Sequence, residues 1–156
     1  MLKIKIICLG KLKEKAFMEL EKEYLKRLRP FAKVKLVELP EVSYRATDDI
    51  ERVKQKEAAA IMRHLTKDAL IILLEEKGVL RNSRDFAAFV ERLGSLGQEL
   101  IFVIGSGIGL HDSLHAISNH QISLSPLTFP HNFARVLLEE QLYRTCTIIA
   151  RKEYHK

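Results

Sequence analysis

The histidine best placed to do chemistry, His131, directly follows Pro130, where the pattern predicts the start of a helix. A helix N-terminus disfavours imidazolium and favours neutral imidazole, which could accept a proton or hold an anion. The alternative is a histidine that caps the helix or faces the solvent. His131 is therefore a candidate proton acceptor, and its role depends on the residues around it.

A second group, His111 and His115 with Asp112 between them, has the four-residue spacing of some helical metal sites. No carboxylate stands at the spacing that a metalloprotease requires, and no cysteine lies nearby in the sequence. We therefore expect no metal at these residues.

Three glycines, Gly105, Gly107 and Gly109, follow a short apolar run that predicts a buried strand. A dinucleotide-binding turn would need glycine where Leu110 stands, and an acidic residue about twenty positions later, where Ser125 stands. Taken alone, these glycines favour a tight turn from a strand into a helix.

A second short strand, expected at residues 121–124, also ends in a turn, which runs through residues 125–130. In open α/β sheets, ligands bind outside the carboxyl ends of the strands. If the two turns lie side by side, they would form one pocket lined mainly by backbone N–H and C=O groups.

The sequence ends with Tyr154, His155 and Lys156. Such a tail is usually frayed. Tyrosine, histidine and lysine together can nevertheless stack on a base, exchange a proton and contact a phosphate.

Hydrophobic patterning predicts the elements that position these residues. We expect strands at 2–9, 33–39, 69–74, 100–104 and 121–124, and a turn at 75–78. Helices are expected at 13–28, 48–65, 82–93, after the three glycines, and from 130 onward. Alternation of strands and helices predicts an α/β fold with a largely parallel sheet, in a single domain over 1–156.

The last helix is apolar on more than one face, which indicates burial or a partner. We interpret this as a homodimer interface. Two pairs of opposite charge at four-residue spacing, Arg135–Glu139 and Glu140–Arg144, suggest ordinary pairing on the helix surface.

The net charge is +6, and its location is informative. Residues 1–40 hold eleven Lys and Arg against five Asp and Glu, whereas the rest of the chain is neutral. A basic surface of this kind is typical of contact with nucleic acid, although a solvated helix face is the alternative.

Cys8 and Cys146 lie in apolar segments, as expected of buried thiols in the cytoplasm. No apolar run is long enough for a membrane helix, and the N-terminus does not resemble a signal peptide.

Several motifs together resemble one family. They are FVIG-x-G-x-G-L, LS-x-LTFPH, R-V-L-L-x-E-Q-L-Y-R, the terminal Tyr-His-Lys, and Leu-Glu-x-x-Gly at residues 74–78. The chain resembles the RlmH family of SPOUT-class RNA methyltransferases along its whole length. The resemblance implies a SPOUT fold with a deep trefoil knot near the C-terminus. It also implies methylation of N3 of a pseudouridine in the large-subunit (23S) ribosomal RNA, on assembled ribosomes, by a cytoplasmic homodimer.

The resemblance further implies S-adenosylmethionine as the cofactor and assigns residues to it. The cofactor-binding residues would be Leu74, Gly105, Leu124, Ser125, Pro126, Leu127, Thr128 and Phe129. The catalytic residues would be His131, His155, Tyr154 and Arg144. Without the resemblance, Leu74 and Leu127 are interpreted as core residues. Ser106 and Glu153 depart from the glycine and proline of many relatives, so a non-catalytic ribosome-binding module with the same fold is the alternative function.

Overall fold

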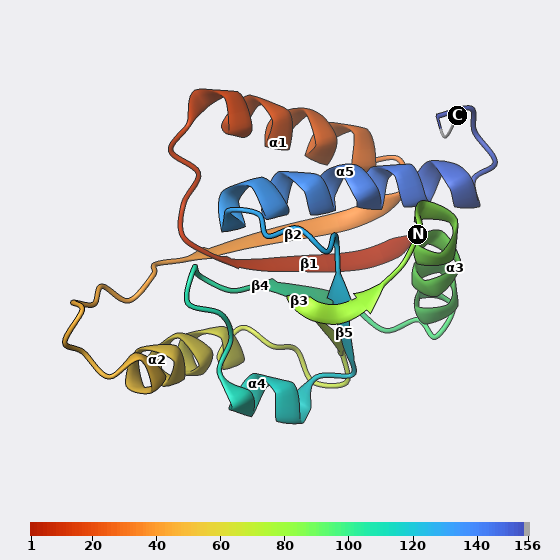
Figure 1. The fold of residues 1–156 in the computed structure, drawn as a ribbon. Helices are drawn as coiled ribbons and strands as arrows, with labels where there is room; N and C mark the ends of the chain where they lie inside the picture. The colour runs from red at the N-terminus through yellow and green to blue at the C-terminus, as the bar shows by residue number, and fades with distance from the viewer. Residues whose placement is uncertain (155–156) are drawn as a thin grey trace.

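The computed structural model describes residues 1–154, so the predictions for His155 and Lys156 lie outside the described residues. It contains a five-stranded sheet in the order β2-β1-β4-β3-β5, in which every neighbouring pair is parallel (Figure 1). The strands are β1 (Leu2–Leu9), β2 (Ala32–Leu39), β3 (Leu70–Leu80), β4 (Leu100–Ile104) and β5 (His120–Ser123). The helices are α1 (Lys15–Leu28), α2 (Ile50–Met62), α3 (Ser83–Gly94), α4 (Asp112–Ile117) and α5 (His131–Ile149). This architecture confirms the predicted α/β class.

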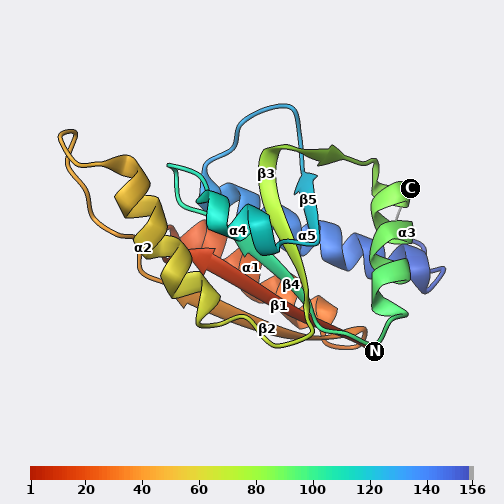
Figure 2. The same cartoon turned by 90° about the horizontal axis from the view of Figure 1, so that it is seen from below.

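The sheet has a hydrophobic core on each face. One core packs side chains from α1, α3 and α5 against the sheet, and the other packs α2 and α4 against the opposite face (Figures 1 and 2). All five residues of β4 are buried, as expected of a central parallel strand covered on both sides. Cys8 and Cys146 are buried free thiols, which confirms the prediction that both side chains are buried. Within residues 1–154, no helix is long and apolar enough to cross a membrane.

Most element boundaries lie within three residues of the predicted ones, and one prediction is wrong. The expected turn at residues 75–78 is part of β3, which continues to Leu80. The pairing of β3 with β5 shifts between Leu74 and Val79, which both align with Ile122, so the intervening residues bulge out of the ladder. Local polarity suggested a turn at 75–78, but pairing with β5 keeps the segment in the sheet.

Arg135 is not on the helix surface, which corrects the interpretation of Arg135–Glu139 as a surface pair. Its side chain is 2% exposed, beneath α5. Its Nη1 lies 2.7 Å from Glu38 of β2, and its Nη2 lies 2.5 Å from Glu21 of α1. One buried guanidinium therefore joins α5 to two earlier elements of the chain.

Glu139 lies beside this guanidinium and is fully buried. Neither of its carboxyl oxygens has a hydrogen-bond partner in the part of the chain that the structure describes. Burial, followed by the nearby carboxylate of Glu21, raises the pKa of Glu139 to about 9. Glu139 is therefore protonated in the folded protein at neutral pH.

Because Glu139 is protonated in the folded protein, the free energy of unfolding depends on pH. The unfolded chain ionises Glu139 near its ordinary pKa of 4.5, whereas the folded chain keeps it protonated up to about 9. Between these values the unfolded state is favoured progressively as pH rises, by up to about 1.4 kcal/mol per pH unit. We expect Glu139→Gln to match the wild type near pH 5 and to unfold at a higher temperature than the wild type near pH 8.

Thermal melts at both pH values measure this difference. Glu91→Gln, on the exposed face of α3, is the matched control and should leave the pH dependence unchanged. A difference between Glu139→Gln and wild type that is the same at both pH values would contradict the assignment.

Candidate functional site

A cavity of about 580 Å³ opens at the carboxyl ends of β4 and β5, beside the bulged middle of β3. Its volume is in the range of small-molecule sites. Three segments form most of its wall, namely the glycine loop (residues 105–109), the 74–77 part of β3 and the β5–α5 loop (residues 124–130). Because β3 lies between β4 and β5 in the sheet, its bulge adjoins the carboxyl ends of both neighbouring strands.

Most residues that sequence reasoning assigned to a cofactor lie around this cavity. Those that line it are Leu74, Gly105, Leu124, Ser125, Leu127, Thr128 and Phe129, whereas Pro126 is not part of the lining. The alternative that Leu127 is a core residue is wrong, because its side chain is 71% exposed. Leu74 is half-buried, packing against the core while facing the cavity.

The glycine loop makes close packing at the cavity wall possible. A Cβ at Gly105 would lie 2.8 Å from Cδ2 of Leu110, so a side chain there would displace Leu110. Gly109 has φ +82°, which favours glycine. Gly107 has open space around it. A ligand can therefore approach the backbone of this loop directly.

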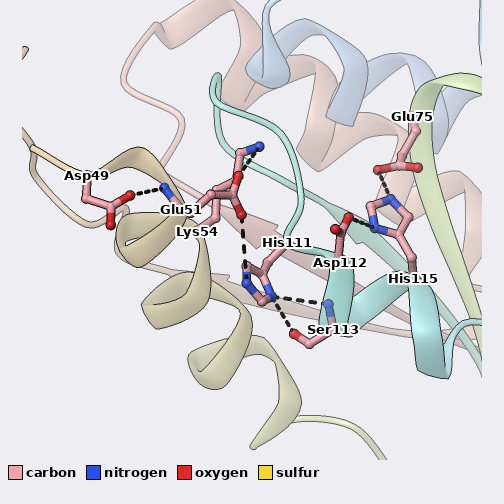
Figure 3. A network of polar contacts seen from close by, with 8 residues as sticks. All are labelled: Asp49, Glu51, Lys54, Glu75, His111, Asp112, Ser113 and His115. Atoms are coloured by element: carbon pink, nitrogen blue, oxygen red, sulfur yellow. Dashed lines mark hydrogen bonds and ion pairs between the residues drawn. The ribbon is translucent and has the colours of Figure 1, made fainter.

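The side of the cavity nearest α2 and α4 carries both signs of charge (Figure 3). Nε2 of His115 lies 2.6 Å from Oε1 of Glu75, and Asp112 is next to the same ring, 3.5 Å from Nδ1. Lys54 of α2 also lines the cavity, with Nζ 3.1 Å from Glu51. The cavity thus offers carboxylates and an ammonium group to one ligand.

His111, the N-cap of α4, and His115, within α4, do not point toward a common site. His111 caps α4 by accepting a hydrogen bond from the backbone N–H of Ser113, and its Nε2 lies 3.9 Å from Glu51. His115 turns instead to Glu75 (Figure 3). Over residues 1–154, no three His, Cys, Asp or Glu side chains are placed to hold a metal ion.

His131 is the first residue of α5 and lines the cavity. Its Nε2 lies 3.2 Å from Oε1 of Glu41, in the segment after β2. Gly10, with φ +85°, leaves room for this pair, because a Cβ there would lie 3.0 Å from Nε2 of His131. The cavity, a histidine and a carboxylate behind it are therefore in one place.

Arg144 and Tyr154 lie elsewhere, in what we call the tail cluster, made of Glu140, Tyr143, Arg144 and Tyr154. Arg144 pairs with Oε1 of Glu140 at 2.6 Å, and the Tyr154 hydroxyl donates to the same oxygen at 3.3 Å. The Arg144 guanidinium lies over the Tyr154 ring, 4.9 Å from its centroid. Burial, followed by a hydrogen bond with Tyr24, raises the pKa of Tyr154 to about 12.

His131 begins α5, whereas Arg144 lies in the second half of the helix and Tyr154 lies after its end. At about 1.5 Å of rise per residue, Arg144 is about 20 Å along the helix axis from His131. One chain therefore brings His131 to the cavity and keeps Arg144 and Tyr154 away from it.

A second, smaller hollow of about 320 Å³ lies beside β5 and α5. Val79, Phe86, Leu124 and Leu137 contribute apolar surface to it, and Leu124 also lines the larger cavity. Val79 is an exposed large hydrophobic residue. An apolar surface thus borders the candidate site.

Sequence reasoning missed two carboxylates of these sites, namely Glu41 and Glu140. No motif or spacing connects Glu41 to His131, ninety positions later in the chain. Glu140 did show a four-residue spacing to Arg144, but nothing in that spacing indicated the tyrosine that shares its oxygen.

A family model and several individual proteins match this chain over nearly its whole length. The family model described as "Predicted SPOUT methyltransferase" matches residues 2–155. Proteins named "Ribosomal RNA large subunit methyltransferase H" are similar over nearly the whole chain. The one from Desulforamulus reducens is 43% identical (100% of both chains covered), that from Listeria monocytogenes 41% (98% of this chain, 99% of the relative), and that from Caldicellulosiruptor saccharolyticus 39% (98% and 99%).

The bulge in β3 gives a test of how the cavity wall is built. A Cβ at Gly78 would lie 2.3 Å from the backbone carbon of Ile122, which cannot move without breaking the β3–β5 pairing. We expect Gly78→Ala to lower the free energy of unfolding by about 2 kcal/mol or more. Gly107→Ala, where a Cβ meets nothing, should change it by less than about 0.5 kcal/mol. Denaturant titrations measure both, and equal values would show that the close approach is absent.

Proposed function

The chain belongs to the SPOUT methyltransferase family, and from this we propose that it methylates N3 of a pseudouridine in large-subunit (23S) ribosomal RNA, using S-adenosylmethionine, on assembled ribosomes. The observation that carries the proposal is the cavity at the carboxyl ends of β4 and β5 and the bulge of β3, lined by the residues of the matching motifs. The names of the relatives support the RNA substrate. The trefoil knot, the single domain over 1–156 and the cytoplasmic location are parts of the same proposal.

The cavity suits the chemical groups of S-adenosylmethionine. Leu74, Gly105 and the 124–129 segment offer apolar surface and backbone groups to an adenine and a ribose. Lys54 suits the carboxylate of the methionine part, and Glu75 and Asp112 suit its ammonium group. The cofactor supplies an activated methyl group, so the protein must mainly align donor and acceptor and remove the N3 proton.

His131 is the described residue best placed to take that proton. When Nε2–H donates to Glu41, the lone pair of a neutral imidazole is on Nδ1, which is then the nitrogen free to accept a proton. His155 is the second candidate, and it lies outside the described residues. Arg144 and Tyr154 would hold the RNA, through a phosphate and by stacking on a base.

The distance between His131 and the tail cluster supports a homodimer. A rigid α5 keeps the two apart in one chain, so we propose that the tail cluster of a second copy completes the cavity. The apolar surface around Val79, Leu127 and Leu137, beside the cavity, is the contact we assign to that copy. The basic residues of α1, including the exposed Lys15, Lys22 and Lys26, would contact ribosomal RNA.

Calorimetric titration with S-adenosylmethionine, with NAD as the control, tests the proposal first. Binding of the methyl donor alone, followed by methyl transfer to ribosomes that lack the mark, is the expected result. If neither the free protein nor the protein with ribosomes binds the donor, the chain is a non-catalytic RNA-binding module with this fold.

The assignment of Lys54 predicts a selective loss of affinity. Lys54→Met keeps the apolar stem and removes the cation, so we expect the Kd for S-adenosylmethionine to rise about tenfold. Decarboxylated S-adenosylmethionine lacks the matching carboxylate, and its Kd should stay within about twofold. Lys56→Met, exposed on the same helix, is the control. Equal losses for both ligands would rule out the pairing.

The proposed dimer predicts complementation between two inactive variants. His131→Ala and Tyr154→Ala should each abolish most of the methyl transfer. After the two proteins are unfolded and refolded together, half of the dimers carry both chains, and each of these has one intact site. We expect roughly a quarter of wild-type activity in a methylation assay. No recovery, with mixed dimers demonstrated by differently tagged chains, would place all catalytic residues in one chain.

A further inference from the structure

Glu57 is a carboxylate of α2 that is 3% exposed, although nothing in the sequence marks it as part of a site. Its Oε1 accepts a hydrogen bond from the backbone N–H of Val42 at 3.0 Å. Its Oε2 accepts one from the Ser106 hydroxyl at 2.8 Å. Burial of a carboxylate is costly unless it is well bonded, so both contacts are needed to keep Glu57 where it is.

The two contacts lead toward two different residues of the cavity lining, Ser106 and His131. Ser106 is in the glycine loop, directly after Gly105. Val42 is next to Glu41, whose carboxylate lies 3.2 Å from Nε2 of His131. Glu57 therefore connects two segments that are about sixty residues apart in the sequence: one lines the cavity, and the other contacts His131, which lines it.

We propose that Glu57 is a positioning residue that fixes the glycine loop relative to the Glu41–His131 pair. This inference rests on the proposed function, because it assigns the loop to the methyl donor and His131 to the proton. Through Ser106, Glu57 holds the loop against which the donor binds. Through Val42, it sets the position of Glu41 and so the orientation of the imidazole. Donor and proton acceptor are thus held in one arrangement by a residue that touches neither.

Ser106 acquires a role in this arrangement. A glycine at this position could not donate to Glu57, so the loop would lose its side-chain tether. The hydroxyl of Ser106 provides the bond that keeps the loop in place.

The test uses four variants and one control in the full-length protein. Ser106→Ala breaks the contact to the glycine loop, Glu57→Ala breaks both contacts, and the double variant combines them. Glu57→Gln is the conservative variant, because its amide oxygen can accept from Val42 while its NH₂ donates to Ser106. Gln55→Ala, exposed on the same helix, is the control.

Calorimetric titration with S-adenosylmethionine measures how the contact to the glycine loop affects the affinity for the methyl donor. We expect the Kd to rise about tenfold for Ser106→Ala and for Glu57→Ala, with no further loss in the double variant, because all three variants lose the same hydrogen bond between Ser106 and Glu57. Glu57→Gln and Gln55→Ala should remain within about twofold of the wild type.

Two readouts separate positioning from a merely structural role. Without any ligand, amide hydrogen exchange should accelerate at residues 105–110 in Ser106→Ala, and at both 105–110 and 41–43 in Glu57→Ala. The pH profile of methyl transfer should change in Glu57→Ala, which frees Glu41, and should stay unchanged in Ser106→Ala. Glu57→Gln should restore the wild-type profile.

The outcomes distinguish this inference from the proposed function. If the wild type binds the donor while Ser106→Ala and Glu57→Ala leave the Kd and the exchange rates unchanged, the positioning role is wrong and the function stands. If the wild type binds no donor, either alone or with ribosomes, the function is wrong, and exchange at residues 105–110 alone decides whether the tether exists. Should Glu57→Ala fail to fold, Ser106→Ala still tests the contact to the loop.

Discussion

Three neighbouring strands, β4, β3 and β5, run parallel, and β4 and β5 end beside the bulge in β3. The rest of the site depends on this constraint. The segments after β4 and β5 leave the sheet there, the bulge interrupts the pairing of β3 with β5, and the cavity forms where these three segments meet. Because both faces of the sheet are covered by helices, the edge is where a ligand can reach the backbone.

Buried charges keep the elements around that edge in place. Arg135 joins α5 to α1 and β2, while Glu57 joins α2 to the glycine loop and to the segment after β2. In each case a charged group is buried because several partners satisfy it. Hydrophobic packing alone would hold the helices against the sheet, but it does not fix a loop in one position as a bonded carboxylate does.

The sequence predicted what depends on local patterns. Five apolar residues at 100–104 predicted a buried strand, and the pattern at 82–93 predicted a helix, as observed in β4 and α3. Interactions between distant segments were not predictable. The residues at 75–78 are polar and end in glycine, so they suggested a turn, yet pairing with Ile122 keeps them in β3. Arg135 has a partner at helical spacing, yet its closest contacts are with Glu21 and Glu38.

The same limit applies to the site. Motifs indicated which residues belong together, but not that a 19-residue helix separates two groups of them. A continuous α-helix cannot fold back, so His131 and Arg144 stay at opposite ends of α5 however the loops move. A site that needs both groups must draw them from two chains, and its population then follows the dimer concentration by mass action. Dimer formation would then explain two features of α5, its apolar faces and the separation of His131 from Arg144. The surface that joins two copies would also bring His131 of one copy close to Arg144 of the other.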